Sequence, residues 1–386
     1  MKVLHCCLAA FYIDNYGYQE NILPKMHKIQ GHEVAIVAST ETYLENKSLG
    51  YVNPRNYINE DGVPVSRIPY VKFLPHFLVK KLRLYSGIHQ VLSNFQPDII
   101  FLHDTQFLSI HTIAFYARRN PKVIIYADGH TDFVNSARGW ISKNILHKII
   151  YRYCAKIIAP YTKCFYGTLP SRVNFINEVY DIPKTSIKLL ELGADDSSFD
   201  IVKREIIRIE KRKELNLKEN DFVIISGGKI DKRKNIHFLI EAMNSLLNFP
   251  IKLILFGAPD EEMRYLLSDI ESKENILYLG WQTTSAVYDL LFASDLGFFP
   301  GTHSVLWEQS CGVGLPCVFK KWKNIQHVDL GGNCLFLDDV SVNSIRNAIL
   351  QLYLDPESFL KMEKISQEKC ITHFSYSEIA RRAINQ

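Results

Sequence analysis

Two lysines and one glutamate, carried by separate segments, have the chemistry to hold a nucleoside diphosphate. Lys229 and Lys234 lie in SGGKIDKRKN (226–235) beside Gly228, and Glu308 lies in LWEQSCGVGLPCV (306–318). A diphosphate needs positive charge and backbone N–H donors, which a glycine-rich turn between strand and helix provides. A carboxylate can accept hydrogen bonds from a ribose diol. The pattern predicts a nucleotide site, with a solvated lysine cluster and a surface glutamate as the alternatives.

Histidines in the first half form a second set of candidates. His130 lies between Asp128 and Asp132 in YADGHTDFVN (126–135), directly after an expected strand, and His103 follows another in FLHDTQF (101–107). A histidine next to a carboxylate can act as a general base, so an inverting group transfer stays open. Structural or solvent-exposed roles stay open for both histidines. Gly17, in the first strand-to-helix loop, would let backbone amides approach a phosphate.

Short apolar runs that alternate with helical patterns must position these residues. Strands are expected at 2–8, 33–39, 64–68, 98–103, 122–127 and 156–159, then at 221–228, 251–257, 276–281, 296–300 and 316–321. Such alternation is typical of βαβ units around parallel sheets. A surface helix is expected within 204–221, and the helical end of the chain is expected to break near 374–375. The two series of strands predict an α/β protein of two domains.

Composition and charge limit the possible classes of function. A chain of 386 residues is longer than one hydrophobic core usually supports. Residues 1–190 hold 22 Lys and Arg against 13 Asp and Glu, a net charge of +9. Subtraction from the totals of 45 and 41 leaves residues 191–386 with 23 Lys and Arg against 28 Asp and Glu, a net charge of −5. The basic half favours an anionic partner, and no motif supports nucleic acid. The eight scattered cysteines predict reduced thiols, and no apolar run is long enough for a membrane span.

The segments around the lysines and the glutamate resemble the retaining glycosyltransferases of family 4, which have the GT-B architecture of two facing Rossmann-like domains. In that family a "GRL…KG" stretch supplies an arginine and, five residues on, a lysine to the donor diphosphate. Lys229 and Lys234 hold these positions. The family's "EA…G.PV" segment is matched by EQSCGVGLPCV (308–318), which implies that Glu308 binds the ribose. YGYQENILPKMHKIQGHEVAIVAS (16–39) matches the start of the acceptor domain.

The resemblance implies roles for further residues. ILYLGWQTTSAVYDLLFASDLGFFP (276–300) follows the family's order of elements, so the base would lie near Gly280 and Trp281. His130 would lie beside the transferred sugar, and Lys229 and Lys234 would stabilise the departing diphosphate. The remaining expected donor contacts are Gly17, Gly228, His303, Ser304 and Val305, with Ser304 as a plausible helix cap.

Two departures from the family pattern leave the sugar undefined. The family's phosphate arginine is a lysine here, Lys229, which keeps the charge and loses the bidentate geometry. The family's first glutamate, eight positions before Glu308, is replaced by Pro300 in a shortened loop. Because that glutamate contacts the sugar ring, the identity of the sugar is not implied. His303 and Thr302 are the candidates for its role.

The predicted fold is therefore GT-B. Residues 1–195 would form the acceptor-binding domain, 196–371 the nucleotide-sugar domain, and 372–386 a helix that crosses back to the first domain. The resemblance implies metal-independent sugar transfer with retention of the anomeric configuration. The donor would be a nucleoside diphosphate sugar, and a UDP-sugar is expected because it is the most frequent donor in the family. The acceptor would be a glycan or a polyprenyl-linked intermediate in surface polysaccharide synthesis. No cofactor is expected, and the acidic pair at 195–196 is a weak metal candidate. The alternatives are a nucleotide-sugar epimerase and a catalytically silent sugar-nucleotide binding protein.

The expected location is cytoplasmic, peripheral on the inner membrane face. VKFLPHFLVKKLRLYSGIHQVL (71–92) mixes lysines with phenylalanines and leucines, a composition that suits docking on an anionic membrane surface. A core-facing helix with a basic outer side is the alternative for this segment. The net positive charge of the first half favours the membrane.

Overall fold

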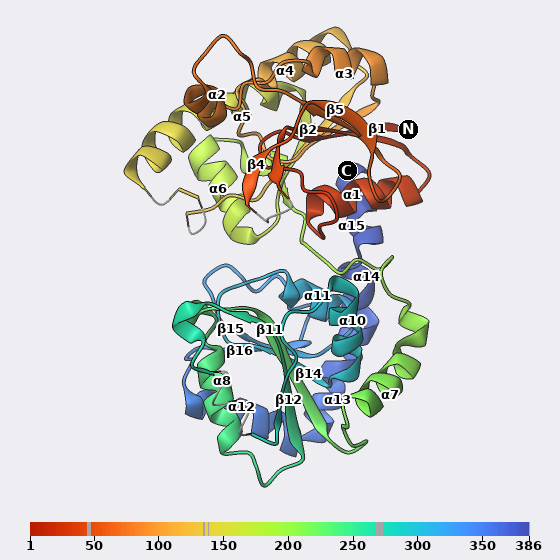
Figure 1. Ribbon diagram of the computed structural model, residues 1–386, viewed down its shortest axis with the longest axis vertical. Helices are drawn as coiled ribbons and strands as arrows, with labels where there is room; N and C mark the ends of the chain where they lie inside the picture. Colours follow the sequence, from red (N-terminus) through yellow and green to blue (C-terminus); the bar gives the residue numbers. More distant parts are fainter. Residues whose placement is uncertain (45–47, 134–135, 138, 267–269, 271–272, 386) are drawn as a thin grey trace. The chain divides into compact units, whose positions relative to one another are not determined.

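The computed structural model describes residues 1–44, 48–133, 136–137, 139–266, 270 and 273–385. They form two compact units, one of Met1–Glu191 with Ile379–Gln386 and one of Leu192–Glu378 (Figure 1). Each unit is built on a mainly parallel sheet with helices packed on it. The predicted α/β class with two Rossmann-like domains is confirmed, as is the C-terminal helix that returns to the first unit.

The chain passes between the units at positions that differ from the expected 195/196 and 371/372. The units change at Glu191/Leu192 and again at Glu378/Ile379. Backbone pairing explains the difference. The amide of Ala194 donates to the carbonyl of Phe374 over 2.8 Å, and the amide of Tyr376 donates to the carbonyl of Ala194 over 2.9 Å. These bonds keep both connecting segments in the second unit.

The first unit contains an eight-stranded sheet in the order β10-β9-β8-β7-β1-β2-β6-β5, parallel throughout except between β5 and β6. Its strands are β1 (Lys2–Cys7), β2 (Glu33–Ser39), β5 (Arg55–Ile58), β6 (Pro64–Ile68), β7 (Ile99–Leu102), β8 (Ile124–Gly129), β9 (Thr162–Gly167) and β10 (Ile187–Leu189), with a separate hairpin of β3 (Glu41–Tyr43) and β4 (Leu49–Tyr51). Its helices are α1 (Gln19–Ile29), α2 (His76–Leu82), α3 (Ile88–Phe95), α4 (Ile110–Arg119), the π-helical segment η1 (Ser142–Tyr151), α5 (Arg152–Ile158) and α6 (Pro170–Tyr180). The central strands are largely apolar because helices bury both faces, and His5 in β1 and Asp128 in β8 are buried exceptions.

The second unit contains a fully parallel six-stranded sheet in the order β13-β12-β11-β14-β15-β16. Its strands are β11 (Phe222–Ile230), β12 (Ile251–Pro259), β13 (Ile276–Tyr278), β14 (Leu296–Phe299), β15 (Cys317–Lys320) and β16 (Cys334–Leu337). Its helices are α7 (Arg204–Glu214), α8 (Ile236–Asn244), α10 (Thr284–Ala293), α11 (Leu306–Gly312), α12 (Val342–Leu354), α13 (Pro356–Ile365) and α14 (Ile371–His373). The last helix, α15 (Tyr376–Ile384), carries the chain back into the first unit.

Both sheets reverse their winding direction at one place. In the first unit the reversal lies between β1 and β7, and in the second between β11 and β14. Ligands of open α/β sheets bind outside the carboxyl ends of the strands at such a switch point. The loops after these four strands are therefore where each unit should hold its functional side chains.

Two local expectations were wrong. The apolar run at 156–159 is not a strand, because it completes α5 and a short 3₁₀ turn before β9 begins at Thr162. Gly227 and Gly228 do not form a turn either, since β11 continues through both to Ile230. The predicted break in the terminal helix is confirmed, because α14 ends at His373 and α15 begins at Tyr376.

The cysteines and the helices bear on disulfides and membrane spans. All eight cysteines are free thiols. Among the residues described, no helix combines the length and apolar character that crossing a bilayer requires.

Candidate active site

The loops after β11 and β14 are held together at the switch point of the second unit. Asn235 donates from Nδ2 to the carbonyl of Pro300 over 2.9 Å, and the amide of Thr302 donates to the carbonyl of Arg233 over 3.1 Å. At Gly301 the backbones approach so closely that a Cβ would lie 2.3 Å from Cα of Lys234. Glycine is therefore required there, and the two predicted segments share one edge of the sheet.

The two lysines of this edge differ in their surroundings. Lys229, near the end of β11, is 65% exposed, and its Nζ lies 3.9 Å from a carboxylate oxygen of Asp231. Lys234 is mostly buried and donates from Nζ to the carbonyls of Thr302 (2.7 Å) and His303 (3.2 Å). Burial lowers the pKa of Lys234 to about 8. A bound anion would stabilise the charged form of this partly desolvated lysine.

Glu308, on α11, is fully buried and lies between two histidines. Nε2 of His303 and Nε2 of His327 each donate to the same oxygen, Oε1, over 2.7 Å. Burial opposes ionisation of Glu308, but the two imidazoles outweigh it and lower its pKa to about 2. Glu308 is therefore a carboxylate at neutral pH. Sequence reasoning missed His327, which lies in a loop without a recognisable pattern.

Several buried polar atoms around this edge have no hydrogen-bond partner in the described part of the chain. They are Oε2 of Glu308, Oγ of Ser226 and Nε1 of Trp307. Ser226 and Trp307 line a cavity of about 10 Å³ together with Lys234, enough for roughly one water molecule. Buried polar groups are normally paired, so unsatisfied groups gathered at a switch point indicate a place for a polar ligand.

The other expected donor contacts surround this edge. Gly228 has a positive φ of 95°, which favours glycine. Ser304 does not cap α11 with its side chain, since Val305 is the N-cap residue and no side-chain cap bond forms there. Gly280 follows β13, also with positive φ, and Trp281 beside it is 75% exposed. An exposed indole at the carboxyl end of a strand can stack on a base.

In the first unit, His130 and His103 lie on either side of Asp128. Oδ2 of Asp128 is 3.2 Å from Nδ1 of His103 and 3.4 Å from Nε2 of His130. Burial opposes protonation of His130, but the charge of Asp128 outweighs it and raises the pKa of His130 to about 9. Gly17 lies in the exposed loop before α1.

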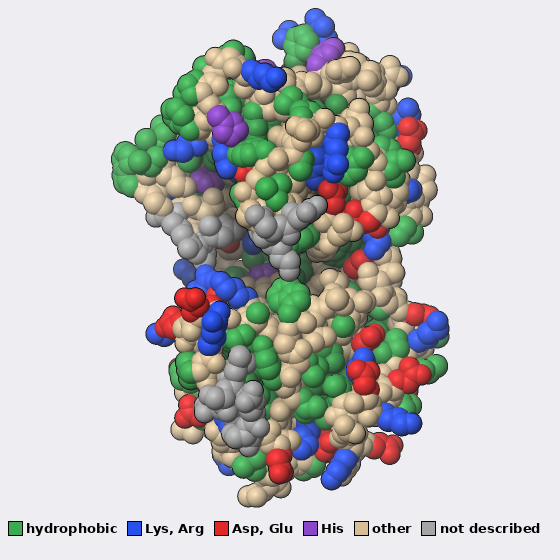
Figure 2. All heavy atoms as spheres, viewed as in Figure 1, with side chains coloured by type: hydrophobic (Ala, Val, Ile, Leu, Met, Phe, Trp, Pro, Cys, Tyr) green, Lys and Arg blue, Asp and Glu red, His purple; other side chains and the backbone are tan. Residues whose placement is uncertain are grey.

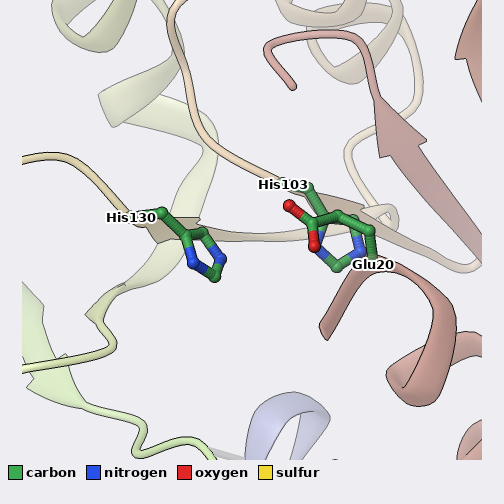
Figure 3. Close-up of side chains that lie close together, drawn as sticks. All are labelled: Glu20, His103 and His130. Atoms are coloured by element: carbon green, nitrogen blue, oxygen red, sulfur yellow. The ribbon is translucent and has the colours of Figure 1, made fainter. Parts of the chain in front are cut away.

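Glu20, in the first turn of α1, completes this cluster. Figure 3 shows its carboxylate against the ring of His103, with the imidazole of His130 directed toward the pair. One ligand-type atom of each residue lies within 4.8 Å of the others, as is also true of His303, Glu308 and His327. In the second group both imidazoles bind Glu308, and in the first His103 and His130 pair with Asp128.

Comparison with known proteins finds similarity to glycosyltransferases. Residues 207–369 match the family model described as glycosyl transferases group 1. The chain is 22% identical over 302 residues to an uncharacterized glycosyltransferase of Methanocaldococcus jannaschii, covering 75% of this chain and 72% of the relative. It is 25% identical over 325 residues to the UDP-Gal:alpha-D-GlcNAc-diphosphoundecaprenol alpha-1,3-galactosyltransferase of Escherichia coli, covering 77% of each.

The fold is shared with solved glycosyltransferases. A glycosyltransferase structure from Rickettsia africae superposes with a TM-score of 0.69 at 12% identity, over 100% of this chain and 97% of that one. At this identity the likeness concerns the fold, which is GT-B. The family match and the two relatives support a group 1 glycosyltransferase.

Proposed function

We propose that this chain transfers a sugar from a nucleoside diphosphate donor, with UDP as the nucleotide, to a lipid-linked glycan acceptor, and that the anomeric configuration is retained. The observation that carries the proposal is the position of Lys229, Lys234 and Glu308 at the switch point of the second unit, where α/β sheets bind nucleotides. The similar Escherichia coli protein is named for a UDP-sugar donor and a diphosphoundecaprenol-linked acceptor. Synthesis of a surface polysaccharide is the corresponding setting.

Donor binding requires a local rearrangement. The cavity beside Lys234 is far smaller than a nucleotide, because Nζ of Lys234 is held by the backbone of Thr302 and His303. In the proposed complex Lys234 releases these carbonyls and pairs with the diphosphate, together with Lys229. Oε2 of Glu308 accepts from the ribose. The base lies at Gly280 and Trp281, and the phosphates lie near Gly228, Ser304 and Val305.

In the proposed reaction a phosphate oxygen of the leaving group takes the acceptor's proton, so neither a side-chain base nor a metal is needed. Lys229 and Lys234 stabilise the negative charge that develops as the sugar–phosphate bond breaks. His130 contacts the transferred sugar. With a pKa raised to about 9 it is mainly an imidazolium at neutral pH. It is then a hydrogen-bond donor and a poor general base, which disfavours the inverting alternative.

A pocket in the first unit fits an acceptor that joins an anion to a lipid. It has a volume of about 380 Å³ and is lined by apolar and aromatic side chains, including Phe77 and Tyr85, and by Lys81 and Arg83. Within the described residues, neither Lys81 nor Arg83 pairs with a carboxylate, whereas the neighbouring Lys80 pairs with Glu41 over 2.7 Å. Arg83 donates to the carbonyl of Gln106 over 2.8 Å. Both cations can meet a diphosphate while the aromatic wall meets the start of a polyprenyl chain.

The surface beside this pocket suits a membrane. Phe73 is 78% exposed just before α2, Phe77 on α2 is 63% exposed, and Trp140 before η1 is 72% exposed. The hydroxyl of Tyr151 donates to the carbonyl of Lys81 over 3.0 Å, which joins η1 to the end of α2. Figure 2 shows apolar and basic side chains close together over this part of the unit. We propose that it docks on an anionic bilayer.

The proposal is tested in two steps. A thermal-shift panel of nucleoside diphosphates and their sugars identifies the donor, because a ligand that binds the native state raises apparent stability. Transfer from that donor to a diphosphate-linked lipid glycan is then followed by mass spectrometry, with the new linkage assigned by NMR. An axial product from an axial donor supports retention. Conversion of the donor without acceptor identifies an epimerase, and UDP binding without any turnover identifies a silent binding protein.

A further inference from the structure

Two imidazoles and two carboxylates meet at the carboxyl edge of the first unit's sheet. Glu20 lies in the first turn of α1, Asp128 lies near the end of β8, and His103 and His130 directly follow β7 and β8. One ligand-type atom each of Glu20, His103 and His130 lies within 4.8 Å of the others (Figure 3). His103 and Asp128 are buried, whereas Glu20 and His130 are partly exposed, so an ion from solution can reach the group.

The contacts that Asp128 makes with the two imidazoles are not hydrogen bonds. Its Oδ2 lies 3.2 Å from Nδ1 of His103 and 3.4 Å from Nε2 of His130. Nδ1 of His103 and Oδ2 of Asp128 are buried and have no hydrogen-bond partner in the described part of the chain. Nε2 of His103 contacts Nδ1 of His5 over 3.0 Å, so Nδ1 is the nitrogen that His103 can offer to a ligand. Buried polar atoms normally have a partner, and a bound ion would supply one.

The distances around Asp128 suit two ligands of one metal ion. Zinc lies about 2.0–2.1 Å from imidazole nitrogens and about 2.0–2.2 Å from carboxylate oxygens, so tetrahedral coordination places neighbouring ligand atoms roughly 3.3–3.5 Å apart. Both distances from Oδ2 of Asp128 are close to this spacing. Glu20 is the looser member, and its partly exposed side chain must move inward to complete the set. Imidazole and carboxylate are both ligands that zinc accepts.

The charge of the group also favours a divalent cation. The carboxylate of Glu20 makes no hydrogen bond or ion pair with another residue that the structure describes, although two imidazoles lie beside it. Two carboxylates and two neutral imidazoles carry two negative charges, which one divalent cation balances. Arg172, a cation of α6, lies 3.7 Å from the carboxylate of Asp132, which already balances part of its charge. Buried charges are normally paired or coordinate metals.

The second unit contains a group of similar composition with a different geometry. His303 and His327 both donate from Nε2 to Oε1 of Glu308 over 2.7 Å. A nitrogen that carries a hydrogen toward a carboxylate cannot bind a metal at the same time, and 2.7 Å is shorter than the ligand spacing around zinc. Hydrogen bonds therefore close the second group, whereas the geometry of the first group suits an ion.

We propose that Glu20, His103, Asp128 and His130 bind one divalent transition-metal ion of the zinc class. The ion joins the start of α1 to the ends of β7 and β8. It occupies Nε2 of His130, and zinc thereby inhibits sugar transfer. This inhibition rests on the proposed function, in which His130 contacts the transferred sugar, whereas the binding of the ion does not.

Zinc titration of the full chain against a chromophoric chelator tests binding without any nucleotide. We expect one zinc ion per chain, and an affinity at least about tenfold lower in Glu20→Gln and in His130→Gln, because each variant removes a ligand. Glu33→Gln and His111→Gln, at exposed positions of the same unit, are the matched controls and should bind as the wild type does. Wild-type affinity in both ligand variants would overturn the proposal. If His130→Gln does not fold by circular dichroism, Glu20→Gln decides alone.

Cobalt(II) in place of zinc reports which ligands hold the ion, and His303→Gln reports which unit holds it. We expect the d–d absorption of a site with nitrogen and oxygen ligands, without a thiolate charge-transfer band. His303→Gln should keep the wild-type affinity for zinc. A thiolate band would place the ion at the cysteines, and a loss of affinity confined to His303→Gln would place it at Glu308. Either result would overturn the proposal.

Transfer kinetics with and without zinc test the inhibition. Saturating zinc should lower the wild-type kcat at least about tenfold, with recovery when a chelator is added, because a group that contacts the sugar is withdrawn. At the same zinc concentration Glu20→Gln should stay within about twofold of its own metal-free rate, since its site is incomplete. Equal inhibition of both proteins would contradict the role of this site. If the wild type transfers no sugar even without zinc, the proposed function fails, and the zinc titration alone then judges the metal site.

Discussion

The two units place different chemistry at the same topological position. At the second unit's switch point, Lys234 donates to two backbone carbonyls, and several buried polar atoms have no partner among the described residues. At the first unit's switch point, His5 and His103 are bound to one another and, through them, to Asp128 and His27. The first arrangement is prepared for a charged ligand, whereas in the second the histidines mainly contact one another and the carboxylate of Asp128.

This difference arises from the residues that follow the strands and not from the topology. The loops after β11 and β14 carry cations and closely approaching glycines, so they can accept an anion. β1 and the position directly after β7 carry imidazoles, those of His5 and His103, which contact one another. A Rossmann-like sheet therefore fixes where a site lies, and the side chains at its carboxyl edge decide whether the site is open.

The largest effect is expected at Glu308. Glu308→Ala removes the proposed ribose acceptor and leaves two buried imidazoles without theirs, so kcat/KM should fall by roughly a hundredfold or more. Steady-state kinetics with the donor identified above measures it. Glu262→Ala, a surface glutamate 66% exposed on the same unit, serves as the control. A Glu308→Ala variant near wild type would remove the donor-site assignment.

The second largest effect is expected for Lys234→Ala. Its kcat/KM should fall about a hundredfold because a desolvated cation no longer contacts the leaving diphosphate. Lys232→Ala is the matched control, since Lys232 lies two residues away and its side chain is 74% exposed. Both variants should keep the melting temperature within a few degrees. Equal activity of the two variants would mean that the cluster acts only as surface charge.

A smaller, selective effect is expected in the acceptor pocket. Arg83→Ala should raise the KM for a diphosphate-linked lipid acceptor about tenfold and leave the donor KM unchanged, because one charged contact typically contributes a little over 1 kcal/mol. Lys122→Ala, on an exposed loop of the same unit, should change neither constant. If the donor KM rises instead, Arg83 belongs to the nucleotide site.

The smallest effect concerns stability and pH. The pKa of His27 is lowered to about 4 in the folded protein, so between this value and the ordinary 6.5 the unfolded chain binds more protons. This contribution to stability is present above pH 6.5 and is lost as the pH falls toward 4. Urea unfolding between pH 7.5 and 4.5 should therefore show a flatter dependence for His27→Gln than for wild type. Parallel curves would exclude a neutral buried His27.

The donor site could be predicted from sequence because its residues follow a local pattern. Lys229 and Lys234 come after an apolar run and before a helix, and Glu308 precedes a Gly-Leu-Pro turn, so their place at a sheet edge follows from βαβ connectivity. The pattern did not predict how these residues pack against neighbouring segments. The sequence predicted a turn at Gly227 and Gly228 where β11 continues, and it gave no sign that Lys234 binds the opposite loop.

The residues that were missed are those whose partners lie far along the chain. His327 meets Glu308 from a loop 19 positions later, and His5 and His27 meet across a strand and a helix. A single histidine in an apolar strand has no local signature. The expected strand at 156–159 failed for a related reason, since buried helix ends and buried strands have similar composition and the break at Pro160 is compatible with both.

The contrast between the two units is tested most directly by isothermal titration of UDP into the wild-type chain, Lys234→Ala and His130→Gln. We expect UDP to bind the wild type and His130→Gln with similar affinity, and to lose most of its affinity for Lys234→Ala, because the nucleotide is held by the second unit. Undiminished binding to Lys234→Ala, or a loss confined to His130→Gln, would contradict the donor site described here.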